Sequence, residues 1–166
     1  MRKKTIEDYV EIIYDIQEQK GQVHTNDIAN ALAINPASVT EIFRKLHAEG
    51  YIHYQKYAGA TLTKEGKRIA IKTKKKHETL KDFLIILGVN KTIANEDACK
   101  IEHVVNPKTM SRLSKFVEFV NESKERALWL EHFDYYYSTG KFISCNPDDT
   151  VSCPIHKKRK KKKLVD

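Results

Sequence analysis

The chain has 166 residues and a formal net charge of +8, and its length allows one ordinary domain or two small ones with a buried apolar core. Seven of the positive charges lie within residues 157–163, so the rest of the chain carries only +1. Residues 1–76 contain 14 lysines and arginines against 9 acidic residues, whereas residues 77–156 contain 9 against 12. The first half is therefore where we expect a polyanionic partner such as nucleic acid to bind.

Two features argue against a secreted or membrane-bound protein. The chain has three cysteines, an odd number, and its first residues run directly into an amphipathic stretch without the apolar segment of a signal peptide. The longest strongly apolar run covers residues 83–89, far fewer than the roughly 20 residues needed to span a bilayer. We expect a reduced, cytoplasmic protein with no membrane partner.

The first half of the chain predicts three helices followed by a hairpin. Apolar residues recur every three or four positions in residues 6–16, which indicates an amphipathic helix. A short second helix is expected up to Leu32, capped by Thr25 or Asn26. Asn35 and Pro36 suit the cap and first position of a third helix that runs to about residue 49. The pattern then changes period, and residues 51–62 predict two strands that turn near Gly59.

The second half predicts helices only. Thr63 is placed to cap a long helix that ends at Gly88. Further helices are expected at about residues 93–105 and 107–121, and a seventh carries Trp129, Phe133 and Tyr136. We therefore predict a mainly α protein, divided into a DNA-binding domain at residues 1–72, a helical domain at 73–140, and a C-terminal extension at 141–166.

The order helix, short helix, tight turn, helix, hairpin is typical of a winged helix-turn-helix. In that arrangement one face of the third helix packs on the core and the other faces the major groove. Small residues at its start allow close approach to base edges, and hydroxyls can contact phosphates. The candidate DNA contacts are Asn35, Ala37, Ser38, Thr40, Glu41, Arg44 and Lys45, with Lys56 and Tyr57 on the wing. The alternative is a small helical domain that does not bind DNA. The negative charge of Glu41 would repel DNA phosphates and therefore favours this alternative, although a carboxylate can also accept a hydrogen bond from cytosine.

A set of metal-ligating side chains is distributed over three predicted helices. Cys99, Glu102 and His103 are spaced by three and four residues and so share one helical face. Asp8 and Glu11 form a similar pair on the first helix. His77 lies on the long helix expected to pass between the two groups. This donor set suits a first-row divalent ion with five or six ligands better than a structural zinc.

Each candidate ligand also has an ordinary structural explanation. Asp8 and Glu11 could be partners of a helix dipole, His77 a solvated helix residue, and Cys99 a small core residue. The combination favours a metal site. The sequence contains no nucleophile paired with a base and no phosphate-binding loop, so it does not support an enzyme or a small-molecule substrate.

Several short segments together resemble the diphtheria toxin repressor and manganese transport regulator family. They are DYVE at residues 8–11, DIANAL at 27–32, PASVT at 36–40, LTKEG at 62–66, HE at 77–78 and ACKIEHV at 98–104. The resemblance covers roughly residues 4–120. It implies a homodimer that binds palindromic operator DNA when Mn²⁺ or Fe²⁺ is bound and that represses genes of metal homeostasis.

Carried over from the family, five of the candidates match metal ligands of its manganese branch: Asp8, Glu11, His77, Glu102 and His103. Cys99 instead matches the iron branch, which has a Met where this chain has Asp8. Asn95 and Lys81 stand where an ancillary iron-branch site would have ligands, so we expect that site to be missing. The sequence therefore predicts a metal-dependent transcriptional regulator with Fe²⁺ or Mn²⁺ as cofactor, and a metal-independent winged-helix regulator is the alternative.

The C-terminal extension offers two weaker hypotheses. Cys145, Cys153 and His156 could form a small zinc site, or they could be incidental residues of a loop. The lysine-rich run at residues 157–163 is predicted to be disordered, and it would either add sequence-independent DNA affinity or keep the chain soluble.

Overall fold

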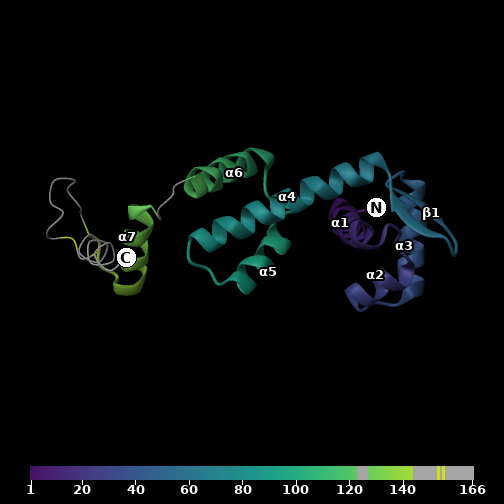
Figure 1. Cartoon of the computed structure of the whole chain (residues 1–166), viewed down its shortest axis with the longest axis horizontal. Helices are drawn as coiled ribbons and strands as arrows, with labels where there is room; N and C mark the ends of the chain where they lie inside the picture. The colour runs from purple at the N-terminus through teal and green to yellow at the C-terminus, as the bar shows by residue number, and fades with distance from the viewer. Residues whose placement is uncertain (123–126, 144–152, 154, 156–166) are drawn as a thin grey trace.

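The computed structural model describes residues 1–122, 127–143, 153 and 155. The described residues form a mainly helical chain with one two-stranded antiparallel hairpin, so the predicted fold class is confirmed (Figure 1). In order, the elements are α1 (Lys3–Lys20), α2 (Thr25–Leu32), α3 (Pro36–Ala48), β1 (Ile52–Gln55), β2 (Gly59–Leu62), α4 (Lys64–Ile86), α5 (Lys91–Ile101), α6 (Pro107–Glu122) and α7 (Leu128–Thr139).

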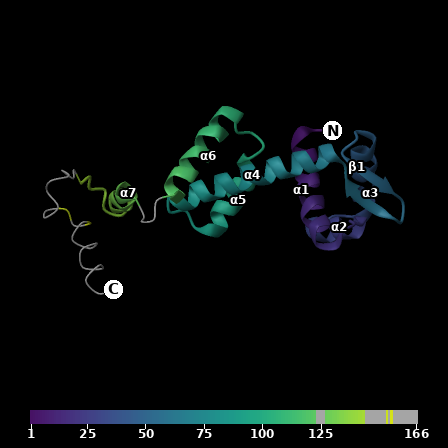
Figure 2. The same cartoon turned by 45° about the horizontal axis from the view of Figure 1, so that its top comes forward.

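The first core lies between α1, α2, α3 and the hairpin. Its centre consists of side chains with no solvent exposure, among them Val10, Ile13, Ile28 and Phe43. The ring of Phe43 meets the ring of Tyr54 edge to face at 5.3 Å, which fixes the hairpin against α3. Figure 2 shows this group at one end of the molecule, with α5 and α6 in the middle.

Local capping determines how α2 and α3 begin. The Asn35 side chain accepts a hydrogen bond from the Ala37 N–H at 2.8 Å, and Pro36 occupies the first helical position, as predicted. The predicted cap of α2 is wrong, because the helix already begins at Thr25 and His24 holds the capping position. The Asp27 carboxylate accepts from the His24 N–H at 2.8 Å, so an acidic side chain inside the first turn satisfies the backbone.

The hairpin pairs Ile52 with Leu62 and Gln55 with Gly59, leaving residues 56–58 as its loop. Tyr57 in this loop has a left-handed backbone, with φ of 71°. Val23 forms a further antiparallel bridge with Ala60, through hydrogen bonds of 3.0 and 2.7 Å, and so ties the segment after α1 to the wing.

Helix α4 connects the first core to a second one. Thr63 caps it as predicted, since its hydroxyl accepts from the Gly66 N–H at 3.1 Å and donates to the Gly50 carbonyl at 2.8 Å. Gly66 packs so closely that a Cβ there would lie 2.0 Å from the Tyr51 carbonyl oxygen. At its far end α4 packs on α5 and α6, where the second core is built on the side chains of Leu80, Ala98 and Met110.

Helix α5 is shorter than predicted. It ends at Ile101, and residues 102–104 form a turn in which the Val104 and Val105 N–H groups both reach the Ile101 carbonyl, at 3.1 and 3.2 Å. The cause is local. Asn106 precedes a proline and is therefore disfavoured in a helical conformation, and its side chain accepts from the Lys108 N–H at 2.9 Å to start α6.

The C-terminal region is described only in part. Helix α7 ends at Thr139, and Gly140 after it has the left-handed backbone of a helix stop. Cys153 is buried, and its Sγ lies 3.5 Å from His132 Nε2 of α7. Cys145, His156 and the lysine-rich run lie outside the described residues, so both C-terminal hypotheses stay predictions. None of the helices described here is long and apolar enough to cross a membrane.

Candidate metal centre and nucleic-acid interface

Five of the six candidate metal ligands line one cavity of about 470 Å³ between α1, α4 and α5. Asp8 and Glu11 reach it from successive turns of α1, and His77 from the middle of α4. Cys99 lies near the end of α5, and Glu102 is the residue that caps this helix. Residues far apart in the chain are therefore brought together, although which of them bind metal remains a prediction.

The imidazole of His103 lies just behind this cavity, in the turn that follows α5. Its side chain is 2% exposed, and Nε2 lies 2.8 Å from Asp8 Oδ1 and 3.2 Å from Glu102 Oε1. The contact with Asp8 is short but not directed as a hydrogen bond, and Nε2 is a buried atom without a hydrogen-bond partner. A buried nitrogen left in this way beside two carboxylates is suited to coordinating a cation.

Outer hydrogen bonds orient both histidines. Glu7, itself 6% exposed, faces His103 Nδ1 with Oε2 at 2.9 Å, and because a carboxylate accepts, Nδ1 is the donor in this contact. On α4, His77 Nε2 lies 3.0 Å from the Asn95 side-chain oxygen, while Nδ1 lies 2.9 Å from Glu102 Oε2. A histidine held by an acceptor on one nitrogen and facing a carboxylate with the other is typical of metal sites.

The carboxylates of the cavity repel one another. Burial raises the pKa of Glu11 to about 7, and the negative charge of Glu102 adds to the shift. The pKa of Glu102 is also raised by burial, although His77 and His103 offset part of the effect. Burial likewise raises the pKa of the Cys99 thiol, helped by the neighbouring carboxylates. A divalent cation would remove the repulsion that these groups share.

Some pairs of candidate donors already lie as far apart as neighbouring ligands of a divalent ion. Neighbouring ligands of an octahedral ion with bonds of about 2.1 Å lie about 3 Å apart. The three contacts of His77 and His103 with Asp8 and Glu102 measure 2.8, 2.9 and 3.2 Å. Within the described ranges, however, no three His, Cys, Asp or Glu side chains already converge as a cage. The donors pair with each other, and an ion would have to replace those pairings.

Sequence reasoning missed Glu7, Asn95 and Leu32 at this site. Glu7 lies three residues before Val10 on the buried face of α1, so its position in the helical pattern marked it as enclosed. Asn95 had been considered only as a departure from an ancillary site. Leu32, the last residue of α2, is 37% exposed and borders the cavity.

The candidate DNA contacts lie on one side of α3 and at the tip of the hairpin. Ala37, Ser38, Glu41, Arg44 and Lys45 are exposed, whereas Thr40 is half-buried and its hydroxyl donates to the Pro36 carbonyl at 3.0 Å. Asn35 uses its side-chain oxygen as a helix cap. The assignment of these residues to DNA stays a prediction.

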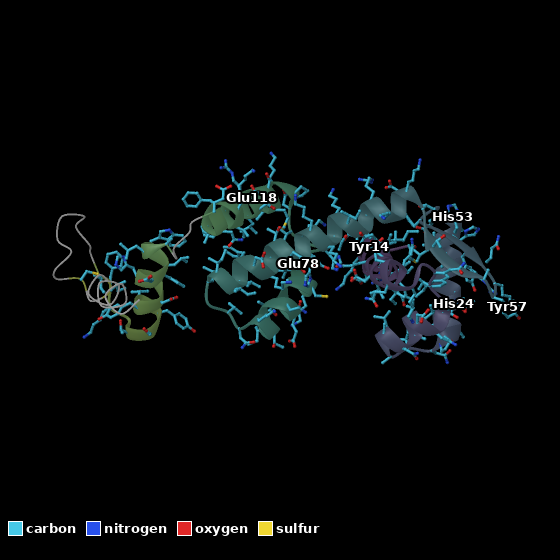
Figure 3. All side chains as sticks on the ribbon, in the orientation of Figure 1. Tyr14, His24, His53, Tyr57, Glu78 and Glu118 are labelled. Carbon is cyan, nitrogen blue, oxygen red and sulfur yellow. The ribbon has the colours of Figure 1, made fainter. Side chains whose placement is uncertain are left out.

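On the wing, Tyr57 is 87% exposed and its ring centroid lies 5.0 Å from Lys56 Nζ. Figure 3 shows Tyr57 projecting at the end of the molecule, away from the rest of the chain. A left-handed backbone at a bulky residue costs free energy, so this exposed aromatic side chain is a candidate for contact with a partner.

Comparison with known proteins identifies both halves. Residues 1–60 match the family described as iron dependent repressor, N-terminal DNA binding domain, and residues 63–129 match its metal binding and dimerisation domain. The chain belongs to the iron-dependent repressor family. The predicted family membership is confirmed, and so is the general function as a metal-dependent transcriptional regulator. Members of this family are regulators rather than enzymes.

Sequence alignments with two relatives extend over most of the chain. The chain is 40% identical over 131 residues to the HTH-type transcriptional regulator MntR of Bacillus pumilus, a match to 79% of this chain and 91% of that protein. It is 42% identical over 117 residues to the HTH-type regulator MJ0568 of Methanocaldococcus jannaschii, covering 69% of this chain and 94% of that one.

Solved structures share the fold. The manganese regulator SloR superposes with a TM-score of 0.61 at 31% identity, over 69% of this chain and 54% of SloR. A manganese-dependent transcriptional repressor in complex with manganese gives a TM-score of 0.62 at 28% identity, over 69% and 53% of the two chains. The chain thus spans about half the length of these structures.

Proposed function

We propose that the protein is a homodimeric repressor that binds operator DNA in the cytoplasm when Fe²⁺ or Mn²⁺ is held by Asp8, Glu11, His77, Cys99, Glu102 and His103. The observation that carries the proposal is the cavity in which α1 of the DNA-binding half meets α4 and α5 of the metal-binding half. A ligand held there contacts both halves. We further propose that the DNA-binding domain extends to residue 72 and the helical domain to residue 140.

The switch that we propose acts through the position of α1. Without metal, the carboxylates repel one another, as the rise of the Glu11 pKa to about 7 indicates. A bound cation supplies positive charge at the same point and draws the carboxylates of α1 toward the ligands of α4 and α5. This fixes the DNA-binding half, and hence the spacing of the two recognition helices in a dimer.

Support for a homodimer comes from apolar side chains on the metal-binding half. Ile85, Ile93 and Phe119 are 39%, 52% and 64% exposed, on α4, α5 and α6 respectively. Exposed apolar residues of this kind mark interaction surfaces. They belong to the segment matched as a dimerisation domain.

The metal preference depends on Asp8 and Cys99. The carboxylate of Asp8 is a hard ligand that suits Mn²⁺, and the thiolate of Cys99 favours Fe²⁺ or a softer ion. Relatives named for manganese support Mn²⁺, and the name of the family supports Fe²⁺. We propose that both ions activate the protein and that their availability in the cell decides between them.

Fluorescence anisotropy with labelled palindromic operator-like DNA tests the proposal, under anaerobic and reducing conditions. We expect tight binding in Mn²⁺ or Fe²⁺ and weak binding in chelator, and Glu102→Gln should bind weakly in both. Glu78→Gln is the matched control, because Glu78 is an exposed carboxylate beside His77 that pairs with Lys81 instead. Equal DNA affinity in chelator and in metal would favour the metal-independent alternative.

A further inference from the structure

A second cavity, of about 480 Å³, lies between the start of α1, the first half of α4 and the beginning of α6. Apolar side chains supply most of its lining, including Ile6, Ile69, Val105 and Met110. Its volume falls within the range of sites for small organic molecules, and it is far larger than a single inorganic ion needs. None of the six candidate metal ligands lines it.

Positive side chains border this cavity along one edge of α4. Arg68, Lys72 and Lys76 follow each other at intervals of four residues, so they form a row on the helix surface. Like charges at this spacing destabilise a helix unless they are compensated. Glu65 compensates Arg68 with two contacts of 2.8 and 2.6 Å, and Glu7 lies 3.7 Å from Lys76.

Lys72 is the exception in this row. Across the part of the chain that the structure describes, it takes part in no hydrogen bond or ion pair. Its charge therefore stands at the mouth of an apolar cavity without a counter-charge. An anionic group bound at this point would complete the row.

Thr73, the next residue, lines the same cavity from inside. The side chain is 1% exposed, yet its hydroxyl has no hydrogen-bond partner among the described residues. Helical threonines elsewhere in the chain, such as Thr40 and Thr79, satisfy their hydroxyls by donating to a carbonyl one turn earlier, at 3.0 and 2.9 Å. In the described part of the chain, His103 Nε2 is the one fully enclosed polar side-chain atom without a partner, so the Thr73 hydroxyl opens onto the cavity, where a ligand can bond to it.

We propose that this cavity binds a small organic anion with an apolar body, whose acidic group is held by Lys72 and Thr73. The apolar body would lie against Ile69, Val105 and Met110. Such a ligand would contact both halves of the protein, as the metal does. It would also adjoin Glu7, whose Oε1 faces Lys76 in this cavity and whose Oε2 faces His103 of the metal centre. By linkage, the ligand and the metal would then influence each other's affinity.

Titration of the full chain with anilinonaphthalene sulfonate, an apolar anion that fluoresces when shielded from water, tests the proposal. We expect saturable binding of one probe per chain, weakened about tenfold by Lys72→Gln because a charge-assisted contact is lost. Met110→Trp should fill the cavity and abolish binding. Lys74→Gln is the matched control, since Lys74 pairs with Asp15 outside this cavity, and it should bind like the wild type.

Thr73→Val separates a ligand-binding role from a structural one. Removing a hydroxyl that bonds no protein group should leave the melting temperature near that of the wild type and weaken probe binding several-fold. The uncharged N-phenylnaphthylamine should bind much more weakly than the sulfonate. The proposal is overturned if Lys72→Gln and Met110→Trp bind the probe like the wild type. It is also overturned if the uncharged probe binds as well as the sulfonate, or if inorganic phosphate alone displaces the probe. Loss of near-ultraviolet circular dichroism on probe binding would also overturn it, because that would indicate a loosened core.

Discussion

Glu7 and Asp8 are neighbours in sequence, but they approach His103 from its two different nitrogens. Glu7 Oε2 lies 2.9 Å from Nδ1, and Asp8 Oδ1 lies 2.8 Å from Nε2. One carboxylate therefore orients the imidazole through Nδ1, and the other shares the Nε2 side, where a cation could bind. A histidine from the metal-binding half is in this way held by α1 even before a metal binds.

Replacing Glu7 should weaken metal binding although Glu7 is not a predicted ligand. In Glu7→Ala the acceptor for His103 Nδ1–H is lost, and we expect metal affinity to fall by about 10- to 100-fold. Glu7→Gln keeps an oxygen acceptor and should retain most of the affinity. Competition with a fluorescent metal indicator measures both, and Glu78→Ala serves as the exposed control. Wild-type affinity in Glu7→Ala would contradict this role.

The raised pKa of Glu11 makes the stability of the metal-free protein depend on pH. Since the pKa rises from its ordinary value of 4.5 to about 7, the folded state binds more protons than the unfolded state between these values. The contribution of Glu11 to the free energy of unfolding should therefore be greatest below pH 4.5 and should be lost as the pH rises through 7. Partial exposure to solvent limits the loss to on the order of 1 kcal/mol.

Urea unfolding in chelator at several pH values measures this dependence. Glu11→Gln should flatten it, and the matched Glu78→Gln variant should leave it unchanged. A wild-type slope that survives in Glu11→Gln would assign the effect to another group.

At the scale of elements, the sequence predicted what local signals encode. Asn35, Pro36 and Thr63 begin their helices as expected, because capping depends on a few neighbouring atoms. The periodic apolar residues likewise located all seven helices that the structure describes. The end of α5 was misplaced because residues 102–105 continue the helical pattern, whereas the conformational limit is set by Pro107 after Asn106.

The metal centre could be predicted as a set of residues but not as a geometry. Spacing placed Asp8 with Glu11, and Cys99 with Glu102 and His103. The distance between those groups depends on how α1 packs on α4, which no local pattern specifies. The hydrogen bonds from Asn95 and Glu7 could not be foreseen for the same reason.

Gly66 shows how closely the wing and α4 are packed. An alanine in a helix is favoured over glycine by about 1 kcal/mol where space allows. Here its Cβ would lie 2.0 Å from the Tyr51 carbonyl oxygen, so backbone must move, and we expect Gly66→Ala to be destabilising by about 1–3 kcal/mol. Urea unfolding checks this, with the exposed Lys64→Ala as the control for helix propensity. A gain in stability in Gly66→Ala would contradict the close packing.

At the scale of the whole molecule, α4 is the element that both halves share. It begins against the wing at Gly66, carries His77 in its middle and ends in the second core with Leu80. The ligands contributed by α1 are thus drawn toward a helix that belongs structurally to both halves. A cation in the cavity would restrict how α1 and α3 move relative to the apolar surface of α4, α5 and α6 that we propose for the dimer.

This coupling is tested most directly by closing the thermodynamic cycle between metal and DNA. The dissociation constant of Mn²⁺ is measured with and without saturating operator DNA, and that of operator DNA with and without Mn²⁺. The two ratios must be equal, and we expect DNA to tighten metal binding by about 5- to 150-fold, a coupling typical of allosteric proteins. A metal affinity that is the same with and without operator DNA would contradict the metal-held switch.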